Sequence, residues 1–456
     1  MSVEQVDTIV RGGRVVLSSG VVEAAIAVNG GKIVAVASES VLPPAANYID
    51  ASGQLVLPGL VDTHTHIYLD SYRSISESAA CGGVTSLLSY IWPDQAQDIP
   101  GSIDHWRRFG EAASVVDFGL HICLQDSPAS LEQLPAAMEA GVTSLKLMMG
   151  FKRRGMMVSD EFMMAAMEAV GRAGGIASVH CESGGVINYL EEKMVAAGLI
   201  SPVDFPRSRP AQSEVEAIQR AISIAEMAGC PLYIAQITTA DSVDVVADAR
   251  LSGRQVWAET CPHYLFMTEA EYEHQGPLVK IAPPLRTEAD CEALWTGIDR
   301  GIISVVTSDH TGYSREMKQG GWANIFQVPF GFPGSETMLP LMYTEGVVKR
   351  DLPITTLVKL LSENPAKLFG LFPRKGAIQV GADADLVVFD PEAEITITSS
   401  ALHTQADFTP FEGRKVKGQV TNTMLRGDLV VKDGQIVELP PHGEFLVRQP
   451  NTLTAV

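Results

Sequence analysis

The stretch VLPGLVDTHTHI, residues 56–67, decides how this chain folds. It is an apolar run that ends in Asp62-Thr63-His64-Thr65-His66. Alternate residues of a β-strand point to the same face, so His64 and His66 project side by side. Two neutral imidazoles placed in this way can bind one metal ion. Two unrelated polar residues at a strand end would give the same pattern, so the rest of the chain has to decide between these interpretations.

The size and charge of the chain narrow the class of protein. With 456 residues, it is long enough for one large domain and a smaller one. Its 34 Lys and Arg against 54 Asp and Glu give a formal net charge of −20, which argues against nucleic acid or an anionic membrane surface as a partner. The six cysteines include no Cys-x-x-Cys pair, so we interpret them as reduced core residues of a protein in a reducing compartment. With no apolar leader or membrane-length run, we expect a cytoplasmic protein.

The two ends of the chain have the same texture. Short alternating stretches separated by glycine turns fill the first 55 residues and return after residue 380, without helical patterns. We therefore expect both ends to build one small β-sandwich around a different middle. The predicted boundaries are residues 1–56 for the first part of the sandwich, 57–375 for the middle domain, and 376–456 for the second part with a C-terminal tail.

The middle of the chain alternates apolar strands with helices. Ser213 with Glu216, and Thr287 with Asp290, have the spacing of helix-capping boxes. This alternation indicates parallel β/α units, and the number of strands predicts a (β/α)₈ barrel of the TIM type, an α/β fold. The expected strands lie at residues 56–61, 83–88, 119–124, 144–149, 176–180, 232–237, 255–259 and 303–307.

A barrel of this type carries its chemistry at the C-terminal ends of its strands. The polar residues at those ends are His64, His66, Lys146, His180, Gln236 and Asp309. Imidazole and carboxylate are ligands of zinc, manganese or cobalt, and CO2 can convert a lysine amine into a carbamate that bridges two ions. Asp309 could take a proton from water and pass it to a leaving nitrogen. The simpler alternatives are a salt-bridged Lys146 and an Asp309 that caps a helix.

Longer motifs occur along nearly the whole chain. They are LVLPGLVDTHTHI, GGVTS, VTSLKLMMGFK, VHCE, SRPAQSEVEAIQRAI, AETCPHYL, APPLRTEADCEALWTGIDRGIISVVTSDH, NPAKLFGLFPRKGAIQVGADADLVVFDP and FEGRKVKG. These motifs resemble those of a known family, the cyclic amidohydrolases, most closely D-hydantoinase and dihydropyrimidinase and less so allantoinase and dihydroorotase. The resemblance implies a metal-bearing barrel with a β-sandwich, hydrolysis of cyclic amides, and a homo-oligomer, a tetramer or a dimer. It also places the metal ligands at His64, His66, carbamylated Lys146, His180 and Asp309.

Several positions depart from the family pattern. Gln236 stands where the family has a histidine ligand, and its neutral amide oxygen is a poorer ligand for zinc. We therefore expect one metal, or a second one that is weakly held or harder, such as manganese or magnesium. At the substrate positions Phe151 replaces a tyrosine, Ala282 a serine and Phe330 an asparagine, and segment 67–80 is shorter. These changes predict a more apolar pocket than in hydantoinases.

The first hypothesis is thus a metal-dependent hydrolase of a cyclic amide or imide, with one or two zinc or manganese ions and Asp309 as acid and base. A linear amide or carbamate hydrolase of the same fold is the enzymatic alternative, and deamination at one metal is a further one. A non-catalytic scaffold resembling the collapsin response mediator proteins is the alternative from another class. Because five of the six ligand positions keep their residue types, we favour catalysis.

Overall fold

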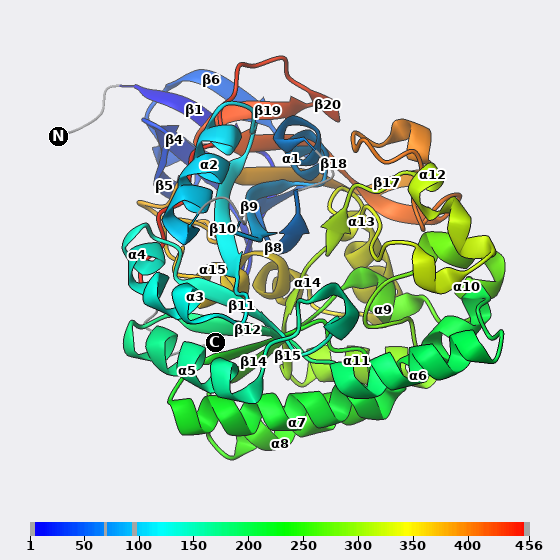
Figure 1. The fold of residues 1–456 in the computed structure, drawn as a ribbon. Helices are drawn as coiled ribbons and strands as arrows, with labels where there is room; N and C mark the ends of the chain where they lie inside the picture. The colour runs from blue at the N-terminus through cyan, green and yellow to red at the C-terminus, as the bar shows by residue number, and fades with distance from the viewer. Residues whose placement is uncertain (1–4, 68–70, 94–97, 451–456) are drawn as a thin grey trace.

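The computed structural model describes residues 5–67, 71–93 and 98–450. Its centre is a parallel sheet whose strands follow one another in chain order (Figure 1). Strands β8 and β15 are buried except for the half-buried His66 at the end of β8, as expected for strands covered by helices on the outside. The strands are β8 (Leu60–His66), β9 (Val84–Ile91), β10 (Asp117–Cys123), β11 (Ser144–Met148), β12 (Ile176–His180), β13 (Leu232–Ala235), β14 (Val256–Thr260), β15 (Ile303–Val306) and β16 (His310–Thr311).

The sheet closes into a barrel because its two end strands are neighbours along the chain. β15 pairs with β14 at one end of the sheet, and β16 pairs in parallel with β8 at the other. Only residues 307–309 separate β15 from β16, so the two are halves of one interrupted eighth strand. The predicted (β/α)₈ barrel is confirmed.

Helices surround the barrel (Figure 1). None of the helices in the described ranges is long and apolar enough to cross a membrane. The longer ones are α1 (Tyr72–Cys81), α2 (Ile99–Glu111), α5 (Asp160–Arg172), α6 (Gly184–Ala196), α7 (Ala211–Ala228), α8 (Ala240–Leu251) and α11 (Glu288–Asp299). Shorter ones are α3 (Pro128–Glu132), α4 (Leu134–Glu139), α9 (Pro262–Phe266), α10 (Glu271–His274), α12 (Arg315–Gln319), α13 (Met338–Met342), η7 (Tyr343–Val348), α14 (Ile354–Val358), η8 (Lys359–Glu363) and α15 (Asn364–Leu368).

The two predicted helix starts have different outcomes. The capping box of Thr287 is confirmed, since its side chain accepts a hydrogen bond from the Asp290 amide while the Asp290 carboxylate accepts one from the Thr287 amide. The predicted start at Ser213 is wrong. Helix α7 begins earlier, directly after Pro210, and the Ser213 hydroxyl donates to the Pro210 carbonyl at 2.7 Å. Pro210, the residue before the first turn of α7, has no backbone N–H that would need a hydrogen-bond acceptor. The helix therefore begins there without a capping side chain.

Both chain ends build the second domain, as predicted. One sheet has the order β5-β4-β1-β6, and the other has the order β20-β19-β18-β17-β7-β2-β3, which mixes strands from the two ends. Apolar residues of both sheets, among them Ile26 and Leu386, form their shared core. The strands are β1 (Val6–Arg11), β2 (Arg14–Leu17), β3 (Gly20–Glu23), β4 (Ala25–Asn29), β5 (Lys32–Ala37), β6 (Ala45–Asp50), β7 (Leu55–Pro58), β17 (Leu386–Thr396), β18 (Lys415–Leu425), β19 (Asp428–Lys432) and β20 (Gln435–Ile436).

The chain passes from sandwich to barrel at Gly59. The strand expected at residues 56–61 is two strands, because β7 pairs with β17 in the sandwich and β8 pairs with β9 in the barrel. A Cβ atom at Gly59 would lie 2.1 Å from the hydroxyl oxygen of Thr85 on β9, so only glycine fits against β9 at this point.

A buried ion cluster joins barrel and sandwich. The Lys375 ammonium, 1% exposed, lies 2.5 Å from Asp117 at the start of β10, and 2.9 and 2.6 Å from Asp383 and Asp385 just before β17. Burial opposes ionisation of Asp383, but Lys375 and other donors lower the pKa of this carboxyl to about 2. Three carboxylates around one ammonium fix the joint between the two domains.

Candidate active site

The six predicted ligand positions lie at one end of the barrel. His64 and His66 end β8, Lys146 lies in β11, and His180 ends β12, while Gln236 follows β13. Asp309 lies in the interruption between β15 and β16. Because the strands are parallel, their C-terminal ends meet at the same rim. All six residues line one pocket there.

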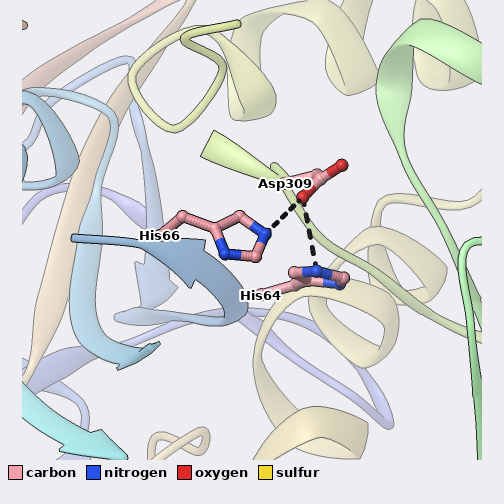
Figure 2. A group of neighbouring side chains, drawn as sticks. All are labelled: His64, His66 and Asp309. Atoms are coloured by element: carbon pink, nitrogen blue, oxygen red, sulfur yellow. Dashed lines mark hydrogen bonds and ion pairs between the residues drawn. The ribbon is translucent and has the colours of Figure 1, made fainter. Parts of the chain in front are cut away.

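His64, His66 and Asp309 form the tightest group (Figure 2). The Oδ1 atom of Asp309 lies 3.1 Å from His66 Nε2 and 3.3 Å from His64 Nε2. One ligand atom from each residue lies within 4.8 Å of the other two. Burial would raise the pKa of Asp309, but the two imidazoles lower it, so the carboxylate stays anionic. Two imidazoles and a carboxylate in this arrangement can hold a divalent cation.

Lys146 lies beside this group without a partner for its amine. The side chain is 2% exposed, and no residue that the structure describes accepts a hydrogen bond from its Nζ atom. The nitrogen lies 4.5 Å from the ring centre of Tyr90. Burial lowers the pKa of Lys146, which favours the neutral amine. A buried polar atom with no partner calls for an explanation, and a salt bridge is not the explanation here.

Gln236 connects the remaining members of the group. Its amide nitrogen donates to Asp309 Oδ2, and its Oε1 atom lies 3.1 Å from His180 Nδ1. The other ring nitrogen of His180 donates to Glu182 at 2.8 Å. His180 Nδ1 and Gln236 Oε1 thus lie within hydrogen-bond distance of each other. Imidazole nitrogen and amide oxygen can both bind a metal ion, so these two atoms are candidate ligands beside the first group.

The substrate positions named from the sequence lie in the same pocket. Phe151, Ala282 and Phe330 line it, and the rings of Phe151 and Phe330 are 5.4 Å apart. Met148, Met156 and Ile281 add apolar surface. The shortened segment 67–80 includes residues 68–70, which lie outside the described residues. Facing the polar cluster, the pocket thus has an apolar wall that can hold the rest of a small substrate.

Comparison with known proteins decides the family. The model of the amidohydrolase family matches residues 55–430, which is most of the chain. This chain belongs to the amidohydrolase family. It is 35% identical to the D-hydantoinase of Ralstonia pickettii over 97% of this chain and 99% of that protein. It is 34% identical to the L-hydantoinase of Paenarthrobacter aurescens, over 97% and 98%.

A solved structure gives the same answer. The dihydropyrimidinase of Brevibacillus agri superposes with a TM-score of 0.94 at 33% identity, covering 98% of this chain and 99% of that one. The resemblance to the hydantoinase and dihydropyrimidinase branch is therefore confirmed. Members of the amidohydrolase family use divalent metal ions, and the cluster of His64, His66 and Asp309 gives this chain candidate ligands for one.

In this amidohydrolase two buried glutamates orient the histidines, and the sequence analysis assigned a role to neither. Glu259 on β14 accepts a hydrogen bond from His64 Nδ1, and a second one from the Tyr233 hydroxyl at 2.6 Å. Glu182 holds His180 in the same way, and Arg209 pairs with its carboxylate. Each glutamate leaves the other ring nitrogen directed at the cluster, as is usual for carboxylates behind metal-binding histidines. Glu182 lies in the motif VHCE and Glu259 in AETCPHYL, so their place in these motifs was the sequence signal that could have identified them.

The backbone of this amidohydrolase is strained at three pocket residues. Phe151, Gln236 and Asp309 have φ angles of 58°, 58° and 50°. This left-handed conformation is uncommon for residues other than glycine and costs about 1–3 kcal/mol per residue. Strain of this kind gathers at functional sites, where the surrounding structure holds it in place.

Proposed function

We propose that this chain is a metal-dependent hydrolase that opens a cyclic amide or imide ring, such as a hydantoin, a dihydropyrimidine or a lactam. The observation that carries the proposal is the convergence of His64, His66 and Asp309 beside the unpartnered amine of Lys146. Similarity to proteins named D-hydantoinase, L-hydantoinase and dihydropyrimidinase supports the same class of reaction. Because relatives of both D and L type are similar, the proposal assigns no stereochemical preference.

The proposed ligand set follows the geometry of the cluster. His64, His66 and Asp309 would hold one zinc or manganese ion, and His180 with Gln236 Oε1 a second, more weakly held one. Lys146, carbamylated by CO2, would supply anionic oxygens to both. When bound, a divalent cation polarises the carbonyl of the substrate and acidifies water.

The proposed role of Asp309 is to carry the proton. Its carboxylate accepts the proton of the attacking water as oxygen adds to the ring carbonyl carbon. It then donates that proton to the ring nitrogen as the C–N bond breaks, so one water molecule is consumed and a carboxylic acid is formed. The hydrogen bond from Gln236 to Oδ2 fixes the orientation of the carboxylate for both steps.

Phe151, Ala282 and Phe330 are proposed to bind the substrate through apolar contact. None of these side chains can donate or accept a hydrogen bond, so the ring would be recognised by its fit between Phe151 and Phe330. Selectivity among neutral ring substituents would then be modest, since one methylene in an apolar pocket is worth about 1–3 kcal/mol.

The same proposal includes the domain boundaries, the oligomeric state and the cellular compartment. The domain boundaries are residues 1–56, 57–375 and 376–456, with the first and third segments in one sandwich. The protein is a homo-oligomer, a tetramer or a dimer, in line with the resemblance to hydantoinases. It acts in the cytoplasm, which the unpaired thiols of all six cysteines support.

The test measures metal and activity together. Protein purified without chelators is analysed for metal per chain by plasma mass spectrometry, and native intact mass detects the carbamate on Lys146. Hydantoin, dihydrouracil and succinimide are then offered to protein supplied with zinc or manganese and bicarbonate. We expect ring opening that a chelator abolishes and metal restores.

Two variants make this test specific. Asp309→Asn should lower kcat by about 10²- to 10⁴-fold, the usual share of general acid–base catalysis. The exposed His274, replaced by Asn, serves as the matched control and should keep the activity. Metal-loaded protein that opens none of these rings would contradict the proposal.

A further inference from the structure

A run of three basic residues, Lys152-Arg153-Arg154, follows Phe151 at the rim of the pocket. The run stands out because the chain as a whole carries a net charge of −20. Arg154 lines the same pocket as His64 and Asp309. It thus places a permanent positive charge beside the apolar residues of the pocket.

The Arg154 guanidinium is held in place by aromatic rings. Its central carbon lies 4.8 Å from the ring centre of Phe330 and 5.9 Å from that of Phe151, the two rings assigned above to the substrate. Cation–π contacts at these distances position a guanidinium without neutralising it. The side chain is exposed, so its N–H groups remain available to a ligand.

Arg154 differs from Arg153 and Arg209 in having no acidic partner. No carboxylate among the described residues lies within ion-pair distance of its guanidinium. Arg153 next to it pairs with Glu192 at 3.2 Å and with Asn188 at 2.9 Å. Arg209 behind it is buried between two glutamates.

A second hollow extends the positive region outward. It shares Phe151, Arg154 and Phe330 with the main pocket, and Lys152 and Arg209 also border it. Its acidic residue, Glu191, pairs with Arg209 at 3.3 Å, so it does not cancel the charge of Arg154. A substituent leaving the main pocket over Phe330 would therefore enter a space with an excess of positive charge.

We propose that Arg154 binds a carboxylate on the exocyclic arm of the substrate, so that the preferred substrates are cyclic amides or imides with an acidic substituent. This inference rests on the proposed function, because it places the scissile ring at the metal cluster. The ring lies between the metal site and Phe330, and the arm reaches the guanidinium, whose two parallel N–H groups match a carboxylate. Arg154 is exposed at the rim of the pocket, so its guanidinium stays hydrated and charged until a ligand meets it.

The experiment compares two hydantoins of equal shape. One carries a carboxyethyl arm and the other the neutral, isosteric carbamoylethyl arm, and kcat/KM is measured for both with metal-loaded protein. Wild type should prefer the acid by about tenfold or more, since a hydrogen-bonded charge pair of this kind is worth about ten- to hundredfold. Arg154→Met should lose this preference, measured as the ratio of kcat/KM for the acid to kcat/KM for the amide. Rising ionic strength should weaken the preference of wild type as well.

Two further variants serve as controls. Arg153→Met removes the same charge one residue away and should keep the preference, because Glu192 already balances Arg153. Arg154→Lys keeps the charge without the fork and should retain part of the preference. Equal kcat/KM for the two hydantoins in wild type, or an unchanged preference in Arg154→Met, would overturn the inference.

Failure of the proposed function gives a different result. If wild type opens neither hydantoin, the proposed activity falls, and calorimetric titration of the two compounds then decides the question of Arg154. Tighter binding of the acid that Arg154→Met abolishes supports the arginine site on its own. Equal binding of both compounds refutes it.

Discussion

Replacing Glu259 by glutamine should weaken metal binding although Glu259 touches no metal in the proposed site. Glu259 is 0% exposed, and its two oxygens are occupied by His64 Nδ1 and by the Tyr233 hydroxyl. Glutamine keeps the size of the side chain but removes its charge. Its amide oxygen can still accept from His64 Nδ1–H, but without the negative charge His64 loses the basicity that favours coordination through Nε2.

The size of the effect follows from the burial of this contact. Removing a carboxylate behind a metal-binding histidine costs about 10- to 100-fold in metal affinity, which is about 1.4–2.8 kcal/mol. We expect the upper half of this range, since the Glu259 carboxylate is fully buried and a charge-assisted hydrogen bond there is worth about 1.5–3 kcal/mol. The expected loss is thus about 30- to 100-fold.

Zinc affinity is measured by competition with a chromophoric chelator, on protein whose thermal unfolding shows an intact fold. Tyr233→Phe is the matched control, because it removes the hydrogen bond to the other oxygen of Glu259 and keeps the charge. It should cost no more than about threefold in zinc affinity, because both the charge of Glu259 and its hydrogen bond with His64 remain. Zinc affinity of Glu259→Gln within about twofold of wild type would refute the reasoning.

Three other predictions concern the second metal and the joint between the domains. Gln236→His should raise the metal content toward two ions per chain, since histidine is a better zinc ligand and tolerates φ near 58°; unchanged content in matched preparations would contradict this. Lys375→Met should cost about 3–5 kcal/mol in the free energy of unfolding by urea, because it leaves the buried Asp385 carboxylate without a cation, whereas Asp117 and Asp383 keep other basic partners; a loss below about 1 kcal/mol would argue against it. The pKa of Asp383 is lowered from 3.8 to about 2, so its carboxylate stabilises the fold above about pH 4 and this is lost as the pH falls toward 2. Asp383→Asn should therefore be less stable than wild type by about 2 kcal/mol at neutral pH, with a gap that narrows as the solution is acidified, and a constant gap would refute the assignment.

The barrel could be predicted from the sequence because its signals are local. Each barrel strand contains a short apolar run, and parallel pairing brings together the polar residues at the strand ends, such as His64 and His180. The helix start at Ser213 was misplaced because capping boxes compete with prolines, and only the folded chain shows that Pro210 prevails.

What the sequence could not predict depends on contacts between distant residues. The division of strand 56–61 at Gly59 comes from the Thr85 side chain, which belongs to the next strand. The pairing of Glu259 with His64 joins residues 195 positions apart, and no spacing rule covers such a distance. Likewise, the unpaired state of Arg154 is visible only once the partners of its neighbours are known.

The pairing of β7 with β17 has a consequence for the order in which this protein can fold. Leu57 lies opposite Val387, so β7 must wait for a partner strand 330 residues further along the chain. Loops this long make folding slow and leave unpaired strand edges exposed to other molecules. During synthesis, β1, β4, β5 and β6 can pair with one another and the barrel can assemble strand by strand, whereas the free edge of β7 is covered only after β17 has been made. Truncation after residue 375 should therefore leave a chain that aggregates through the free edge of β7, and supplying residues 376–456 as a separate polypeptide should keep it in solution.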